Sequence, residues 1–384
     1  MPNSKLFRVS TIPASLNVLL KGQLAFLQKY FDITAISNAG ISLEEVRERE
    51  KVKIHSVAMQ RNISPLKDII SLFKLYLYFK REKPLIVHSI TPKAGLLSMI
   101  AAKIAGVPIR IHTFTGLIFP SKTGLLQRLL IAMDKLLCAC ATNIIPEGNG
   151  VKNDLESYGI TKKPLKILAN GNVNGIDLEY FHPQIVDTKQ KQLLRESLGL
   201  SDADFVFNFV GRLVSDKGIN ELVRAFDELN LSNIKLLLVG PMEAKIDPLQ
   251  SETLKIMESN PNIISVGYQK DVRPYYAISD ALVFPSYREG FPNVVMQAGA
   301  MELPSIVTNI NGCNEIIREG VNGTIIPPRN VEALKNSMHR MATDEIYRLS
   351  LKKNARPMIC SRFEQKLVWE SLLKEYMELI HNRE

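Results

Sequence analysis

The stretch FVFNFVGRLVSDKG, residues 205–218, passes from an apolar run into a loop with two glycines and then into a helical pattern. An apolar strand followed by a loop and a helix is the repeating unit of parallel α/β sheets. The glycines let the loop backbone approach a ligand closely, and the start of the next helix favours an anion. Gly211, Arg212 and Lys217 therefore predict a diphosphate site, with both cations converging on phosphate oxygens. The alternative is a solvated Arg and Lys in an ordinary loop.

The same alternation of short apolar runs and helical patterns extends along the whole chain. It predicts an α/β fold with two doubly wound parallel sheets of the Rossmann-like type. In the N-terminal half the expected strands are 6–10, 32–36, 53–57, 85–88, 109–113, 143–145 and 165–168, and the expected helices include 18–30, 65–80 and 94–105. In the second half the expected strands are 205–210, 234–239, 263–266, 281–284 and 305–308.

The length of 384 residues suits two domains rather than one. We expect a first domain of residues 1–182 and a second of residues 183–362, joined by the polar segment 183–204. Apolar residues at helical spacing after a break at Pro357 predict a C-terminal helix, residues 363–384, that folds back on the first domain. Open α/β sheets bind ligands beyond the carboxyl ends of their strands, so the functional loops of the two domains should face each other across a cleft.

The positive charge of the chain is concentrated in its N-terminal half. Residues 1–185 contain 24 Lys and Arg against 13 Asp and Glu, a surplus of 11, whereas residues 186–384 contain 24 against 26. This imbalance predicts an anionic partner for the N-terminal half. No nucleic-acid-binding motif accompanies the charge, so nucleic acid is excluded as a partner, and an anionic membrane surface or a phosphate-bearing acceptor is favoured.

Membrane contact is expected to be peripheral. The sequence has no apolar run of about 18 residues and no apolar core of signal-peptide length. The four cysteines form no C-x-x-C pair and predict buried thiols in a reducing compartment. We therefore expect a cytoplasmic protein associated with the inner face of the cell membrane. Aromatic and basic residues over 65–83 and 125–137 would suit a membrane surface, but ordinary crossover helices with their apolar sides on the sheet are the favoured interpretation.

A second loop, FPSYREGFPNVVMQA at residues 284–298, runs from a strand end through a Gly/Pro turn into a helix. Its E-G-F-P segment strongly resembles glycosyltransferase family four of the GT-B retaining enzymes. In that family the first Glu and the loop backbone hold the donor sugar, and a second Glu, eight positions later, holds the ribose. The resemblance implies that Glu289 binds the donor sugar, together with the backbone of Gly290, Phe291, Pro292 and Asn293. Gln297 stands where the second Glu is expected, which departs from the family pattern.

The resemblance covers almost the whole chain, because the segments 174–177 (NGID), 211–218 (GRLVSDKG) and 266–271 (VGYQKD) are also similar to family motifs. By analogy, the backbone around Gly267 and Tyr268 covers the nucleobase, and Gly22 begins a helix against the donor phosphates. His112 follows an apolar run and stands where the family has a His that contacts the donor sugar. Its alternative role is a hydrogen-bonded His at a strand end. For His88, also at a strand end, the structural role is favoured.

The resemblance implies a retaining, metal-independent hexosyl- or N-acetylhexosaminyltransferase. The donor would be a nucleotide-sugar, with a UDP-sugar favoured, and the acceptor a glycan or a polyprenyl-diphosphate-linked sugar in capsule or O-antigen biosynthesis. No cofactor and no metal are expected, because Arg212 and Lys217 would stabilise the departing diphosphate. The triplet Asp202-Ala203-Asp204 matches the D-x-D sequence with which another glycosyltransferase class holds a metal, but it precedes a strand rather than following one.

Two other functions remain compatible with this sequence pattern. The chain could be a nucleotide-sugar epimerase or hydrolase on the same two-domain frame. It could also be a sugar-nucleotide-binding subunit without activity, because Gln297 breaks the family motif. A nicotinamide-dependent oxidoreductase is disfavoured, since no G-x-G-x-x-G segment follows the first strand of either domain.

Overall fold

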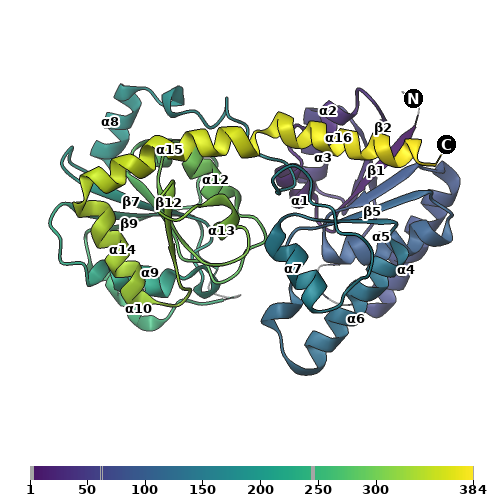
Figure 1. Ribbon diagram of the computed structural model, residues 1–384, viewed down its shortest axis with the longest axis horizontal. Helices are drawn as coiled ribbons and strands as arrows, with labels where there is room; N and C mark the ends of the chain where they lie inside the picture. Colours follow the sequence, from purple (N-terminus) through teal and green to yellow (C-terminus); the bar gives the residue numbers. More distant parts are fainter. Residues whose placement is uncertain (1–3, 61, 63, 244–246, 384) are drawn as a thin grey trace. The chain divides into compact units, whose positions relative to one another are not determined.

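The computed structural model describes residues 4–60, 62, 64–243 and 247–383. The chain divides into two compact units, of which the first comprises Met1–Gly175 with Gln365–Glu384 and the second comprises Ile176–Glu364. In each unit helices cover a six-stranded sheet (Figure 1). All the strand pairs are parallel, which confirms the predicted fold class of two Rossmann-like sheets.

The sheet of the first unit has the strand order β3-β2-β1-β4-β5-β6. Its strands are β1 (Lys5–Val9), β2 (Asp32–Ser37), β3 (Lys53–Ser56), β4 (Ile86–Ser89), β5 (Ile109–Phe114) and β6 (Asn143–Pro146). The strand order reverses between β1 and β4. At such a reversal the flanking loops separate and leave room for a ligand beyond the carboxyl ends of the strands.

The sheet of the second unit repeats this arrangement in the order β12-β11-β10-β7-β8-β9. Its strands are β7 (Phe205–Val210), β8 (Ile234–Val239), β9 (Ile263–Gly267), β10 (Ala281–Phe284), β11 (Ser305–Thr308) and β12 (Gly323–Ile326). Here the reversal lies between β7 and β10. The two loops singled out in the sequence follow these two strands, so the topology brings both to the same end of the sheet.

Helices surround both sheets. Those of the first unit are α1 (Pro13–Leu19), α2 (Gln23–Leu27), α3 (Ile41–Glu50), α4 (Pro65–Glu82), α5 (Pro92–Ile104), η1 (Phe119–Ser121), α6 (Gly124–Cys140), α7 (Asn149–Ser157) and α16 (Gln365–His381). Those of the second unit are η2 (Pro183–Ile185), α8 (Thr188–Ser197), η3 (Ser215–Lys217), α9 (Ile219–Asp227), α10 (Ser251–Ser259), α11 (Arg273–Ala277), α12 (Asn293–Ala300), α13 (Cys313–Ile316), α14 (Val331–Thr343) and α15 (Glu345–Phe363). None of the helices in the described part of the chain has the length and apolarity needed to span a bilayer.

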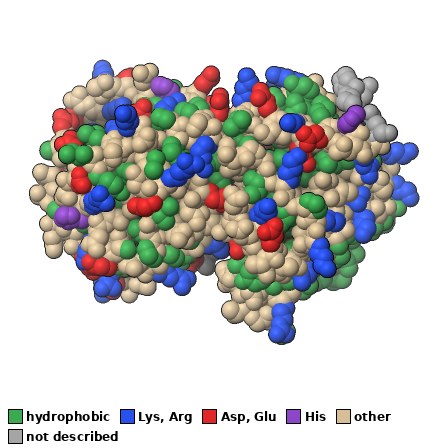
Figure 2. Space-filling model, in the orientation of Figure 1, with side chains coloured by type: hydrophobic (Ala, Val, Ile, Leu, Met, Phe, Trp, Pro, Cys, Tyr) green, Lys and Arg blue, Asp and Glu red, His purple; other side chains and the backbone are tan. Residues whose placement is uncertain are grey.

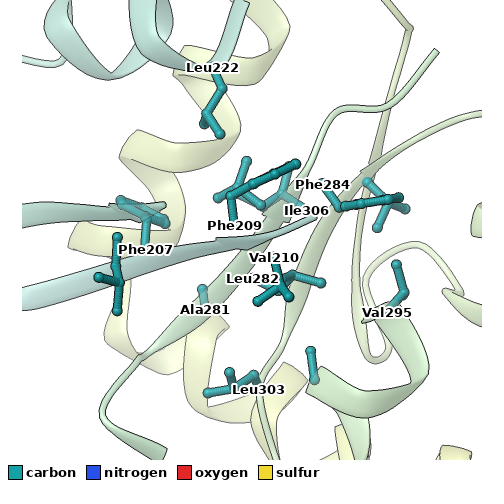
Figure 3. Packing of buried hydrophobic residues seen from close by; sticks show 14 of the residues in the cluster. Phe207, Phe209, Val210, Leu222, Ala281, Leu282, Phe284, Val295, Leu303 and Ile306 are labelled. Carbon is teal, nitrogen blue, oxygen red and sulfur yellow. The ribbon is translucent and has the colours of Figure 1, made fainter. Parts of the chain in front are cut away.

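Each unit has its own hydrophobic core. In the second unit one continuous cluster joins both faces of the sheet to the helices, and Figure 3 shows its centre, where Phe209 of β7 lies near Phe284 of β10 and Val210 lies near Leu282. The Phe209 and Phe284 rings stack with centroids 5.8 Å apart. In the first unit two clusters cover the opposite faces of the sheet. These apolar contacts fix the strand ends from which the functional loops emerge.

The C-terminal helix α16 is part of the first unit. The Nη1 atom of buried Arg8 donates a hydrogen bond of 2.7 Å to the hydroxyl of Tyr376, which lies 2.6 Å from Nδ1 of His88. Trp369 donates from Nε1 to Oδ1 of Asn174 at 2.7 Å. His88 is therefore part of a buried network that holds α16 on the sheet, in agreement with the structural role favoured for it.

Several predicted elements of the first unit are wrong. The helix expected over 18–30 is broken into α1 and α2, because Gly22 adopts a positive φ of 80° between them. Only Leu165 of the strand expected over 165–168 pairs with the sheet, through an isolated bridge to Ile144. Ala169 and Gly171 then turn the chain away with positive φ values of 48° and 94°.

The second unit also differs from the sequence-based expectation. Pro357 does not end a helix but lies inside α15, which continues to Phe363. Burial of Ala355, Ile359 and Phe363 on one side of α15 outweighs the hydrogen bond that proline cannot donate. The segment expected as a linker contains helix α8, which begins with a capping box between Asp187 and Gln190. Strand β12 was not predicted.

Candidate active site

The candidate site lies in the second unit, where β7 and β10 end at the reversal of the strand order. The loop 211–218 follows β7, and the loop 285–292 follows β10. The two loops are joined directly, because the backbone N–H of Tyr287 donates to the carbonyl of Asp216 at 2.9 Å. Gly218 permits this approach: its φ is +73°, and an added Cβ would overlap the carbonyl oxygen of Pro285.

Lys217 and Glu289 come together across these loops. The Lys217 ammonium forms a close ion pair with Oε1 of Glu289, and both side chains are largely shielded from solvent. Oε1 of Glu289 also accepts a hydrogen bond of 2.8 Å from the Ser286 hydroxyl. The ammonium lies 5.7 Å from the centroid of the Phe284 ring. The structure thus places two predicted catalytic residues, 72 positions apart, in direct contact.

Arg212 lies on the same loop as Lys217 and is more exposed. Its Nη1 atom donates to Oε2 of Glu243 at 2.8 Å. This hydrogen bond raises the pKa of the Arg212 guanidinium, and the carboxylates of Asp216 and Glu289 act on it in the same direction. Two fixed positive charges, held by carboxylates at the end of a parallel sheet, form a site suited to a polyanionic ligand.

The segment after Glu289 carries the remaining predicted donor contacts of this loop. Gly290 lies against Gly312, where an added Cβ would overlap the carbonyl oxygen of Gly290. Phe291 packs edge-on against Phe363 with ring centroids 5.4 Å apart, and Pro292 precedes the first turn of α12, which begins at Asn293. The backbone of this segment is therefore held rigidly at the start of a helix.

Gln297 lies one turn into α12 and is half-buried. Its Oε1 atom accepts a hydrogen bond of 3.2 Å from the hydroxyl of Tyr276, a fully buried residue of α11. Tyr276 therefore orients the amide. A ribose contact of Gln297 stays a prediction.

Gly267 ends β9 in the same unit, and Tyr268 follows it. Gly267 has a positive φ of 65°, and its carbonyl accepts a hydrogen bond of 2.8 Å from Gly240. The Tyr268 side chain is 74% exposed, so it is open to a ligand. The role of this segment in covering a nucleobase also stays a prediction.

His112 lies in the first unit, on β5. Its ring is only 1% exposed, its Nδ1 atom is 2.8 Å from the Ser89 hydroxyl, and burial lowers its pKa to about 3. Gly95 of α5 makes room for the ring, because a Cβ there would overlap it. The structure thus places a neutral imidazole inside the sheet–helix layer. A contact of His112 with the donor sugar stays a prediction.

Gly22 lies between α1 and α2 of the first unit. Its backbone N–H donates to Oε1 of Glu50 at 2.9 Å, and an added Cβ would lie 2.7 Å from the Trp369 ring. These contacts explain why a glycine is required at this position. The N-terminus of α2 already holds a carboxylate, because Glu50 also accepts a hydrogen bond of 3.0 Å from the backbone N–H of Ala25. The predicted phosphate contact of Gly22 stays a prediction.

Sequence reasoning missed several residues of the site in the second unit. Ser286, Glu243 and Asp216 contact the predicted residues Glu289 and Arg212 or join their loops. Ser286 and Asp216 could have been found, since Ser286 lies three residues before Glu289 and Asp216 lies directly before Lys217 in the same loops. Glu243 belongs to the loop after β8, and no local pattern connects it with Arg212.

The D-x-D triplet has a structural place. Both hydrogen bonds that Ser201 donates, from its backbone N–H at 2.6 Å and its hydroxyl at 3.0 Å, reach the carboxylate of Asp204. Asp204 thus caps a turn before β7, on the amino side of the strand. Within the described ranges, no three His, Cys, Asp or Glu side chains come close enough together to hold a metal ion.

Comparisons with known proteins agree with this geometry. The family described as "Glycosyl transferase 4-like" matches residues 9–147, and "Glycosyl transferases group 1" matches residues 190–358. The capsular polysaccharide biosynthesis glycosyltransferase CapM of Staphylococcus aureus is 33% identical over 100% of both chains. A UDP-Gal:alpha-D-GlcNAc-diphosphoundecaprenol alpha-1,3-galactosyltransferase of Escherichia coli is 30% identical over 92% of this chain and 90% of its own. Anabaena HepE, solved in complex with UDP, superposes with a TM-score of 0.82 at 18% identity, covering 98% of this chain and 100% of its own.

The two Rossmann-like units, together with these relatives, place the chain in the GT-B class of glycosyltransferases. Within that class the chain belongs to the group 1 glycosyltransferases, with a 4-like first domain.

Proposed function

We propose that the protein transfers a sugar from a nucleotide diphosphate to a lipid-linked acceptor during surface polysaccharide biosynthesis, with a UDP-sugar as donor. The contact of Lys217 with Glu289, beside Arg212, carries this proposal. Cations suit the diphosphate, and a carboxylate suits the hydroxyls of a sugar. The names of two relatives support it, because one acts in capsule synthesis and the other on a diphosphoundecaprenol-linked sugar.

The cations would provide the main catalytic effect. As the bond between the anomeric carbon and the diphosphate oxygen breaks, negative charge develops on the diphosphate, and preorganised positive charge stabilises it. Lys217 is held in place by Glu289, and Arg212 presents a planar set of donors. The acceptor oxygen would attack the same face of the sugar and give its proton to the leaving diphosphate. The configuration would then be retained without a protein nucleophile.

The acceptor would be held at the inner face of the cell membrane, with the enzyme associated peripherally. The surplus of 11 positive charges in residues 1–185 supports this part of the proposal, because anionic lipids attract basic surfaces. A lipid-linked acceptor would be presented at the same surface.

The first test replaces the cations. Arg212→Ala and Lys217→Ala should each lower kcat by more than about tenfold, because each removes charge stabilisation that is strongest in the transition state. The measurement is nucleotide release and sugar transfer from a panel of UDP-, GDP- and ADP-sugars, with and without a polyprenyl-diphosphate-linked acceptor. Arg224→Ala is the matched control, since Arg224 is an exposed cation on α9 whose partner Glu228 also lies on the surface. Near-normal turnover in both site variants would refute the assignment.

The second test concerns metal independence. If Arg212 and Lys217 neutralise the diphosphate by themselves, full turnover should persist in excess chelator. The same transfer assay is run with and without chelator, and then with added magnesium or manganese. Activity that is lost in chelator and restored by either metal would contradict metal independence. The role of Arg212 and Lys217 would then still be decided by the first test.

A further inference from the structure

Helix α4 has two apolar faces, and only one of them is covered. Ser71, Leu75 and Phe79 are buried against the first unit. On the outside, Leu66 is 80% exposed, Ile69 62% and Phe73 58%. Their spacing of three and four residues places them on one stripe of the helix, and exposed Leu77 continues it by one more turn. A long uncovered apolar stripe is unusual on a protein surface and marks an interaction site.

Positive charge runs beside this stripe. Lys67, Lys74 and Arg81 are exposed and follow one another at intervals of seven residues, which is two helical turns. The acidic residues of α4 offset only Arg81 among these three residues. Asp68 is paired with largely buried Lys93, and Glu82 is paired with Lys5 and Arg81. Every exposed charged residue of α4 is therefore basic.

Helix α6 repeats the pattern. Leu125, at 83% exposure, Leu129 and Leu136 are uncovered, and exposed Arg128 and Lys135 lie among them. The acidic residue of α6, Asp134, is half-buried, and burial raises the pKa of its carboxyl to about 7. Its negative charge is therefore weakened at neutral pH, and α6 also presents an apolar and basic outer face.

The two helices belong to one surface. Both pack against α5, on the same side of the sheet. Figure 2 shows hydrophobic side chains, with Lys and Arg among them, along the margin of the first unit where Figure 1 places α4 and α6. We call this surface the α4–α6 face: Leu66, Ile69, Phe73 and Leu77 with Lys67, Lys74 and Arg81 on α4, and Leu125, Leu129 and Leu136 with Arg128 and Lys135 on α6.

We propose that the α4–α6 face docks on an anionic lipid bilayer, with the apolar stripes in the headgroup boundary and the basic residues on lipid phosphates. This inference deepens the membrane association of the proposed function and rests on it. A helix with an apolar side and basic flanks binds in the plane of such an interface. A second copy of the chain fits less well, because pairing two such faces would bring basic residues against basic residues.

The segments 65–83 and 125–137 were expected to be ordinary crossover helices. One side of each helix does cover the sheet, but the other side carries the uncovered apolar stripe. The sequence has apolar residues on both sides of these helices, so it could not show which of them are buried. The burial of individual residues in the structure is the new observation.

The experiment measures co-sedimentation of the full chain with vesicles. Phosphatidylcholine vesicles are compared with vesicles containing phosphatidylglycerol. The chain should bind the anionic vesicles, with binding that weakens as salt rises. The double variant Ile69→Gln/Phe73→Gln should lower binding roughly tenfold or more, because two apolar side chains no longer enter the boundary. Its matched control is Ile346→Gln/Leu349→Gln, which removes two exposed apolar side chains from the second unit.

A charge variant separates the basic contribution. Lys67→Gln/Lys74→Gln should lower binding to anionic vesicles roughly tenfold and flatten its salt dependence. Lys366→Gln/Lys374→Gln removes two exposed lysines from α16 of the same unit and is the matched control. Equal losses of vesicle binding in the control variants and the α4 variants would overturn the assignment of membrane docking to this face. Equal binding of the unaltered chain to neutral and anionic vesicles would also overturn it.

Two further measurements keep the outcomes distinct. Transfer to a short water-soluble acceptor should stay unchanged in all four variants, since none of the altered residues belongs to the candidate active site. Weak vesicle binding of the two α4 variants with normal sugar transfer would support docking through this face. Absence of transfer by the unaltered chain, with the expected vesicle binding, would reject only the proposed function. Light scattering without lipid should show the same mass for the unaltered chain and for Ile69→Gln/Phe73→Gln. A dimer that dissociates in that variant would overturn the bilayer assignment in favour of self-association.

Discussion

Arg212 and Lys217 illustrate how single residues prepare the site in the second unit. Each cation is held by a carboxylate from another loop, Arg212 by Glu243 and Lys217 by Glu289. The two pairs differ in solvent exposure, since the Arg212 side chain is 41% exposed and that of Lys217 is 15% exposed. The first pair is therefore the weaker one and the easier one for a diphosphate to displace.

Glu243 should act as a competitor for the guanidinium of Arg212. Glu243→Gln removes the charge but keeps the shape, so a diphosphate would no longer compete with a carboxylate. An exposed ion pair is worth about 0–1 kcal/mol, so we expect the Kd of the donor to fall by up to about fivefold. Isothermal titration with UDP measures this change directly.

Glu258→Gln provides the control for this measurement. Glu258 is an exposed carboxylate of α10 in the same unit, and its replacement changes the net charge equally. We expect no change in the Kd of UDP for this variant beyond the effect of net charge. Weaker UDP binding in Glu243→Gln than in the control would show that Glu243 supports the donor site instead of competing with it.

The sequence predicted where the loops of the second unit lie, but it did not predict which residues they contact. Gly211, Arg212, Lys217 and Glu289 follow apolar strands, and the ends of parallel strands must meet at one edge of a sheet. The partner Glu243 could not be predicted, because its loop follows β8, the neighbour of β7, and that neighbour relation exists only in the folded sheet. His112 shows the same limit. The sequence placed it at a strand end, whereas its burial depends on Gly95 of another element.

At the scale of elements, the contact between the β7 and β10 loops depends on Gly218. Gly218→Ala would place a Cβ on the carbonyl oxygen of Pro285, in a backbone conformation that is unfavourable for alanine. The loops must then separate and Lys217 must move. We expect a loss of about 2–4 kcal/mol in the free energy of unfolding and a fall in kcat of more than about tenfold. Urea denaturation followed by far-UV circular dichroism and the transfer assay measure the two effects.

Gly199→Ala isolates the contribution of the backbone conformation. Gly199 has a φ of +67°, close to the +73° of Gly218, but a Cβ there would meet nothing within 4 Å. This control should lose only about 1 kcal/mol of stability and keep its turnover. Equal losses of stability and turnover in both variants would mean that the contact with Pro285 is unimportant.

Strands such as β7 and β10 were predicted from apolar runs, whereas the elements predicted wrongly depend on contacts. Strand β7 is buried on both faces and was recognised as an apolar run. Strand β12 begins with Gly323 and Thr324, and it was missed because pairing with β11 creates its extended conformation. The break at Gly22 and the continuous helix through Pro357 are also decided by packing, against Trp369 in the first case and through the buried side of α15 in the second.

At the scale of the whole molecule, the two units have separate hydrophobic cores and unequal roles. The described cations and carboxylates of the candidate diphosphate site belong to the second unit, whereas the α4–α6 face and the surplus positive charge belong to the first. The chain also offers a natural probe for one unit. Its single tryptophan, Trp369, lies in the first unit, where the ring covers Gly22 and lies 5.5 Å from that of Phe26.

UDP should therefore stabilise the second unit selectively. A ligand at 100 times its Kd adds about 2.7 kcal/mol to the free energy of unfolding of the unit that binds it. Circular dichroism reports on both units. We expect the unfolding transition that it follows to show this increase in the free energy of unfolding when UDP is present. Trp369 fluorescence, which reports on the first unit, should shift by no more than about 1 kcal/mol, the contribution of one hydrogen bond if Gly22 contacts the diphosphate. A full shift of the Trp369 transition would mean that UDP is held equally by the first unit, and the assignment of the diphosphate site to Arg212 and Lys217 alone would then be wrong.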